Sequence, residues 1–179
     1  MIHPLFVHLP IGLLVIYSIF EMTRFKVVNQ QPYWFYTKAI LSISGVLMAY
    51  LALATGEGAE HLIEETGTDF QKSIIETHAT LAGATTAIFS ILAFSYLIEW
   101  LKRSPKANEM MQRRLGNIFS FLVRLSDLIK KPSLMIILAA LGLALLTITG
   151  GLGAAMVYGK DVDPIVSFIY SMFSPLFES

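Results

Sequence analysis

The sequence has no cysteine and few charged residues. Without cysteine, the chain cannot form disulfides, cysteine-ligated iron–sulfur clusters or covalently attached c-type haem. Charged residues make up 15% of its 179 residues and hydrophobic residues 55%. That balance is too apolar for an ordinary soluble domain, and the length suits a single domain. The composition therefore indicates one domain embedded in a membrane.

Four apolar segments are long enough to cross the hydrocarbon core of a bilayer. They cover about residues 5–22, 34–54, 74–100 and 134–158. The first lacks a basic region before it and a small-residue cleavage site after it, so we expect a retained membrane helix and not a signal peptide. The sequence predicts an all-α integral membrane four-helix bundle that forms a single four-span domain over residues 1–179.

Basic residues gather on one side of the predicted bundle. Of the 13 lysines and arginines, 11 belong to that side: Arg24, Lys26, Lys38, Lys102, Arg103, Lys106, Arg113, Arg114, Arg124, Lys130 and Lys131. The positive-inside rule makes this side cytoplasmic. We therefore expect a multi-pass protein of the bacterial inner membrane, with loops 23–33 and 101–133 in the cytoplasm. Both termini and the acidic hairpin 56–73 would face the periplasm.

Two segments outside the spans have interfacial character. Apolar residues recur at helical spacing over about residues 108–131, between basic residues, which predicts a cytoplasmic interfacial amphipathic helix on the inner leaflet. A helix that binds a partner protein is the alternative. The tail 164–179 is too short to span and rich in Phe and Tyr, so we expect it at the outer interface.

Imidazoles cluster toward the outer side. His3 and His8 precede or enter the first span, His61 follows the second, and His78 lies about one turn inside the third. We expect His8 and His78 to lie at matching depth on antiparallel helices. An imidazole within the apolar layer needs a polar partner, and such residues are candidates for functional sites. A hydrogen bond to a neighbouring helix is the simpler interpretation.

The acidic hairpin adds carboxylates near these imidazoles. Glu57, Glu60, His61 and Glu64 are spaced so that they share one helical stripe. Imidazole and carboxylate together suit zinc, copper or non-haem iron. The candidate metal ligands are therefore His3, His8, His78, Glu57, Glu60 and His61. A solvated acidic loop is the alternative.

The last span contains four glycines, at positions 142, 150, 151 and 153. Small residues allow transmembrane helices to approach closely, so tight helix packing is one interpretation. The other is a slot for a flat cofactor against the backbone.

Several of these residues together resemble a known bacterial family. The elements are His3-Pro4-x-x-Val7-His8-x-Pro10-Ile11, Thr55-Gly56, His78, and Gly150-Gly151-x-Gly153-x-x-x-Val157-Tyr158. They are similar to the family called domain of unknown function 2231, small predicted membrane proteins with four spans. The resemblance implies the topology and no activity. Many members follow Val-Tyr with a further histidine, where this chain has Gly159-Lys160-Asp161. If the family site uses that histidine, Lys160 or His61 would replace it here, or this chain would do without it.

Three functions remain open from the sequence. In the first, His8 and His78 bind b-type haem with His3 nearby, and the protein passes electrons between a quinone or membrane partner and an outer acceptor. In the second, the His and Glu residues bind a transition-metal ion without porphyrin. In the third, the chain is a non-catalytic scaffold, a homo-oligomer or a subunit of a larger complex. The lipid bilayer is a partner in all three, and nucleic acid in none.

Overall fold

The protein is described by a computed structural model that covers residues 3–23, 25–66 and 69–177, apart from the side chains of residues 3–5, 26–27, 59–66 and 69–71. Every regular element in these ranges is a helix. The helices are α1 (His3–Met22), α2 (Lys26–Asn29), α3 (Pro32–Thr66), α4 (Asp69–Arg103), α5 (Pro105–Leu115), α6 (Asn117–Ile129), α7 (Pro132–Tyr158) and α8 (Pro164–Phe177). The predicted all-α class is therefore confirmed.

Prolines begin several of these helices. Pro32, Pro105, Pro132 and Pro164 are the first residues of α3, α5, α7 and α8. Proline suits this position because its fixed φ matches a helix and its missing N–H would have no partner there. Prolines thus set where the long helices α3 and α7 begin.

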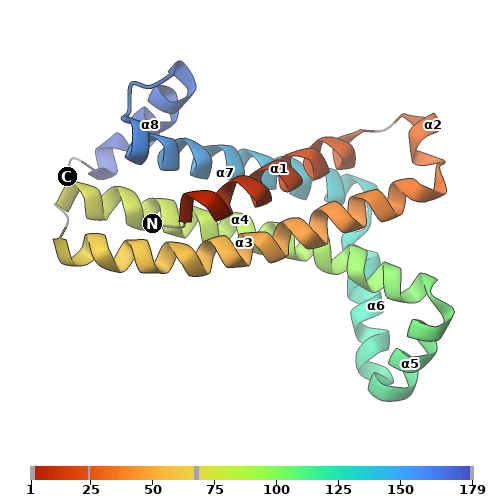
Figure 1. The fold of residues 1–179 in the computed structure, drawn as a ribbon. Coiled ribbons are helices and arrows are strands. Elements are labelled where there is room, and N and C mark those ends of the chain that lie inside the picture. Colours follow the sequence, from red (N-terminus) through yellow and green to blue (C-terminus); the bar gives the residue numbers. More distant parts are fainter. Residues whose placement is uncertain (1–2, 24, 67–68, 178–179) are drawn as a thin grey trace.

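The four longest apolar segments lie side by side (Figure 1). Helix α1 packs on α3 and α7, and α4 packs on the same two helices from the other side. Among the described residues, three helices are long and apolar enough to cross a membrane, over Pro32–Gly58, Lys72–Arg103 and Pro132–Tyr158. The described part of α1 is a shorter apolar helix, Phe6–Met22.

Helices α1 and α4 run in the same direction (Figure 1). The expectation that they are antiparallel is wrong, because α3 runs back between them, so the chain reverses direction twice from α1 to α4. Both therefore begin at the end of the molecule that carries the histidines, which we call the histidine end. Both finish at the opposite end, which carries α2, α5 and α6 and which we call the basic end.

Aromatic side chains join α1 to α4 across the centre. Tyr17 is fully buried and meets Phe89 and Tyr96 edge-on, with ring centroids 6.2 and 5.9 Å apart. Edge-to-face packing of this kind stabilises beyond the area buried. These contacts fix how far α1 sits along α4.

The predicted amphipathic helix over 108–131 is instead two helices. Gly116 separates α5 from α6 with a φ of +49°, a conformation that favours glycine. The pair projects sideways from the long helices (Figure 1). Helix α6 buries Phe119, Ser126 and Ile129 and exposes a second apolar stripe: Ile118, Phe121, Leu125 and Leu128.

The tail after Pro164 is the helix α8 and packs on α7. Asp163 caps it, because Oδ1 accepts the backbone N–H groups of Ile165 and Val166 at 2.8 and 2.9 Å. Ile169 of α8 reaches the α7 backbone at Gly151, where an added Cβ would lie 2.5 Å from Ile169 Cδ1. The glycine therefore sets the spacing between the two helices.

Two glycines of α7 give a matched test of this packing. A Cβ at Gly142 would lie 2.9 Å from Cζ of Phe89, whereas a Cβ at Gly150 would meet nothing within 4 Å. We predict that Gly142→Ala lowers the free energy of unfolding by about 1–3 kcal/mol through overpacking. Gly150→Ala should leave it unchanged or raise it slightly. Thermal unfolding in detergent micelles measures both; equal effects of the two variants would contradict the glycine contact.

Candidate functional site

His78 lies between α4 and α7 and is tied to the backbone of α7. Its Nδ1 is 3.0 Å from the carbonyl oxygen of Thr149. Because a carbonyl only accepts, Nδ1 donates the proton of this bond, and in a neutral ring Nε2 is the nitrogen that has the lone pair. The ring lies over Gly153, where a Cβ would stand 3.1 Å from Cε1. The glycine at 153 thus makes room for this imidazole.

His8 lies on a different face of its helix from the core residues. It is exposed, on the side of α1 that also exposes Ile16 and Ile19, whereas Leu14 and Tyr17 are buried. An outward-facing imidazole at this position does not form the core-facing half of a two-histidine slot.

The heights of the two histidines can be compared through the aromatic contacts of Tyr17. Measured along the axis of α1, His8 lies nine residues, or about 13 Å, before Tyr17. Measured along the axis of α4, His78 lies about 16 Å before Phe89 and about 27 Å before Tyr96. Since Tyr17 packs on both of these rings, His78 is nearer the end of the molecule than His8. The two share an end of the molecule but not one level.

The remaining candidate ligands are only partly described. The side chains of His3, Glu60 and His61 lie outside the described residues. Glu57 is described and exposed. Within the described side chains, no group of three or more histidines and acids is close enough to hold a metal ion. A metal site that combines the predicted ligands stays a prediction.

The glycines of α7 are used mostly for packing. Gly142 receives the ring of Phe89, Gly151 receives Ile169, and Gly153 receives His78. Gly150 has open space beside it and lines a cleft of about 520 Å³ between α7 and α8. The described contacts favour the packing interpretation at three of the four positions.

The basic end contains a buried ion pair. Glu21 at the end of α1 is 2% exposed and lies 3.1 Å from Nζ of Lys38 on α3. Tyr96 of α4 donates its hydroxyl to the same carboxylate at 2.5 Å. Three helices are thus joined at one buried oxygen. Ionisable groups within membrane helices are rare and mark candidate sites.

This group was missed by the sequence interpretation, which counted Lys38 only as a topology signal. A signal was available: Glu21 is the only acid in the first apolar segment, and Lys38 lies near the start of the next one. Two consecutive helices that reverse direction bring such residues to the same level, where opposite charges can pair.

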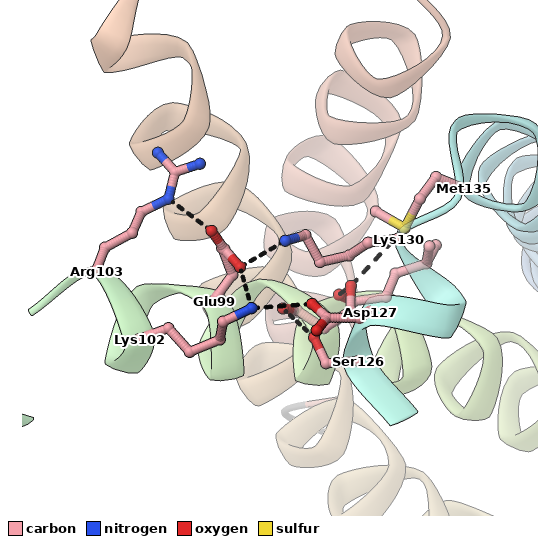
Figure 2. A network of polar contacts seen from close by, with 9 residues as sticks. Glu99, Lys102, Arg103, Ser126, Asp127, Lys130 and Met135 are labelled. Atoms are coloured by element: carbon pink, nitrogen blue, oxygen red, sulfur yellow. Dashed lines mark hydrogen bonds and ion pairs between the residues drawn. The ribbon is translucent and has the colours of Figure 1, made fainter. Parts of the chain in front are cut away.

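A second polar network joins α4 to α6 (Figure 2). Glu99 of α4 accepts from Lys130 at 2.6 Å and from Nε of Arg103 at 3.0 Å, and it lies 3.3 Å from Nζ of Lys102. Lys102 also bonds Asp127 of α6 at 2.9 Å. The carboxylate of Glu99 is therefore the centre that holds α6 at the end of α4.

A cleft of about 380 Å³ lies between the two networks. Its lining includes Glu21, Trp34, Lys38, Arg103 and Lys130. The first turns of α3 and α7 and the last turns of α1 and α4 form its walls. The cleft therefore lies at the ends of apolar helices.

The long apolar helices, the polar networks at one end and the imidazole at the other define a helical membrane protein. The chain matches the family described as "Predicted membrane protein (DUF2231)" over residues 1–164, and it belongs to this family. The expected resemblance is thereby confirmed. No curated protein and no solved structure matches the chain. The family description names membrane residence and no activity.

The buried ion pair gives a direct test of pairing. We predict that Glu21→Gln lowers the free energy of unfolding by about 3–5 kcal/mol, because it leaves the Lys38 ammonium buried without a counter-charge. The double variant Glu21→Gln/Lys38→Met should recover much of this loss. A double-mutant cycle by thermal unfolding in micelles measures the coupling. Purely additive effects would contradict a buried pair.

The Glu99 network gives a test of how α6 is held. We predict that Glu99→Gln increases amide hydrogen exchange across residues 117–129, since Lys130 loses its charged partner. Asp127→Asn is the matched control: its side chain is 51% exposed, and exposed pairs contribute little, about 0–1 kcal/mol. Equal exchange in both variants would show that Glu99 is not the centre of the network.

Proposed function

We propose that the protein uses His78 to hold a metal-centred cofactor at the histidine end, with haem b as the first candidate. One observation carries the proposal: the bond from His78 Nδ1 to the Thr149 carbonyl, which orients the ring so that Nε2 is the nitrogen that would ligate a metal when the ring is neutral. Imidazoles that bind metals commonly have their other nitrogen bonded in this way. Axial imidazole is also a usual ligand of haem iron.

The setting of this site is a four-span bundle in a bacterial inner membrane. The mutual packing of α1, α3, α4 and α7 supports the fourth span. The charge distribution supports its orientation, because the basic end carries 11 of the 13 lysines and arginines and would be cytoplasmic. His78 then lies near the periplasmic surface, together with both termini.

A haem at this depth would supply one-electron chemistry. The chain's own part would be to hold the iron through His78, to orient that ring with Thr149, and to admit it over Gly153. A quinone or a redox protein would be the electron partner. The exposed position of His8 means that a second axial ligand would come from another residue of the chain or from a second copy.

A non-haem metal is the alternative within the same site. Its further ligands would be drawn from His3, Glu57, Glu60 and His61 on the adjoining segments, with His8 nearby. Hard and borderline ligands of this kind suit zinc, copper or iron.

A non-catalytic scaffold is the second candidate function. Its support is the same bond, since α7 satisfies the half-buried imidazole of His78 as the structural role of such a ring requires. The filled positions at Gly142, Gly151 and Gly153 point the same way. In this case the protein would act as a subunit of a larger complex or as a homo-oligomer.

An absorption spectrum of the purified, reduced chain separates these functions. Sharp haem bands that His78→Ala abolishes are the expected result. Thr77→Val is the matched control, because its hydroxyl bonds the Ser73 carbonyl of the same helix at 2.9 Å, and it should keep the bands. Gly153→Ala should shift the bands, because the new Cβ would displace the His78 ring.

Two other outcomes are informative. A colourless preparation with stoichiometric metal, lost in His78→Ala, would replace haem with a metal ion. A folded, colourless and metal-free protein would overturn the cofactor proposal and leave the scaffold function. His78→Ala should then cost only the lost hydrogen bond, about 1 kcal/mol in the free energy of unfolding.

A further inference from the structure

The cleft at the basic end has a buried donor without a partner. Nε1 of Trp34 is inaccessible to solvent, and no acceptor among the described residues bonds it. The indole ring is held in place by Phe20, with ring centroids 4.6 Å apart. Buried donors are almost always satisfied, and Trp34 lines the cleft, so we infer that an acceptor from outside the chain bonds Nε1 when the side chains that cover it move.

Arg103 on the same lining is also poised as a donor. Its guanidinium lies over the ring of Phe35, 3.8 Å from the centroid, and only its Nε bonds Glu99 among the described residues. The two terminal nitrogens therefore remain for another acceptor. The side chain is 44% exposed, so a ligand can reach it. Stacked arginine is suited to phosphate because its planar fork is pre-oriented.

The charge of the cleft favours an anion. Lys38, Arg103 and Lys130 line it together with the carboxylate of Glu21, and the adjoining Glu99 network adds Glu99, Lys102 and Asp127. Four cations against three carboxylates leave one positive charge. All three carboxylates already bond cations, so the lining mainly offers hydrogen-bond donors to a ligand.

The position of the cleft selects the source of the anion. It opens where apolar helices end, beside the aromatic residues Trp34 and Phe35, and this is the depth of lipid headgroups. Basic pockets between transmembrane helices on the cytoplasmic side bind anionic headgroups. We propose that this cleft binds the phosphate diester of an anionic phospholipid, with the terminal nitrogens of Arg103 as the exposed donors and Trp34 Nε1 as a donor that the bound phosphate uncovers.

The two tryptophans allow a direct measurement. Trp34 and Trp100 are the only ones in the sequence, so in Trp100→Phe the fluorescence reports the cleft alone. The full-length variant in detergent micelles is titrated with palmitoyl-oleoyl phosphatidylglycerol, with palmitoyl-oleoyl phosphatidylcholine, and with inorganic phosphate. We expect a saturable change in Trp34 fluorescence with phosphatidylglycerol. The dissociation constant should be at least tenfold lower than with phosphatidylcholine.

Variants of Arg103 test whether its terminal guanidinium nitrogens bind the phosphate. Arg103→Gln should weaken phosphatidylglycerol binding about tenfold, because one charge-assisted bond is lost. The affinity of Arg103→Lys should lie between those of Arg103→Gln and the parent. Arg114→Gln is the matched control: it removes one exposed basic charge from α5, which does not line the cleft. Its affinity should stay within about twofold of the parent, because a distant charge is screened.

Native mass spectrometry repeats the comparison without the Trp100 substitution. The unaltered chain should retain one phosphatidylglycerol, and Trp34→Phe should lose it while remaining folded. Equal binding of both lipids, or equal losses in Arg103→Gln and Arg114→Gln, would overturn the site. Inorganic phosphate that saturates the cleft and displaces lipid would overturn the lipid assignment and make soluble phosphate the ligand. The haem or metal proposal concerns the other end and is unaffected by either result.

Discussion

The need to satisfy polar groups buried between the helices governs this structure. A carboxylate, ammonium or imidazole that is buried in the protein loses its bonds to water, so each must find its partner within the protein. Glu21 finds Lys38 and Tyr96, and His78 finds the Thr149 carbonyl. Each bond joins different helices, which would otherwise gain little by leaving lipid for one another. Polar bonds therefore fix which helices meet, and apolar contacts fill the space between them.

The two ends of the molecule solve this problem differently. At the basic end, opposite charges pair, and a shared carboxylate such as Glu99 can hold several helices at once. At the histidine end, the ring of His78 bonds a backbone carbonyl and packs on a glycine. An imidazole in its neutral form has a lone pair for a metal, whereas a carboxylate that is already paired with cations has little capacity left. The proposed metal binding therefore lies at the histidine end, and the proposed anion recognition lies at the basic end.

The sequence predicted the features that depend on composition along the chain. Apolar length indicated the helices that became α3, α4 and α7, and motifs such as His3-Pro4 and Thr55-Gly56 indicated the family. Features that depend on rotation about a helix axis could not be predicted in this way. Apolar residues surround α1 almost completely, so no stripe showed that His8 faces outward while Tyr17 faces the core.

Partners far apart in the chain were equally hidden. The bond from Lys130 to Glu99 spans 31 residues and follows from the turn at Gly116, whose positive φ no periodicity announces. The apolar period runs unbroken across that glycine, which is why one helix was expected.

Helix α7 shows how one sequence motif can serve two neighbours. Gly151 and Gly153 are two residues apart, about 200° around a helix, and so lie on nearly opposite faces. The first admits Ile169 of α8 and the second admits His78 of α4. A side chain at either position would push away a different helix, so the motif is constrained from both sides. The imidazole is consequently placed by the same close packing that attaches α8, which makes the position of His78 a property of the whole histidine end.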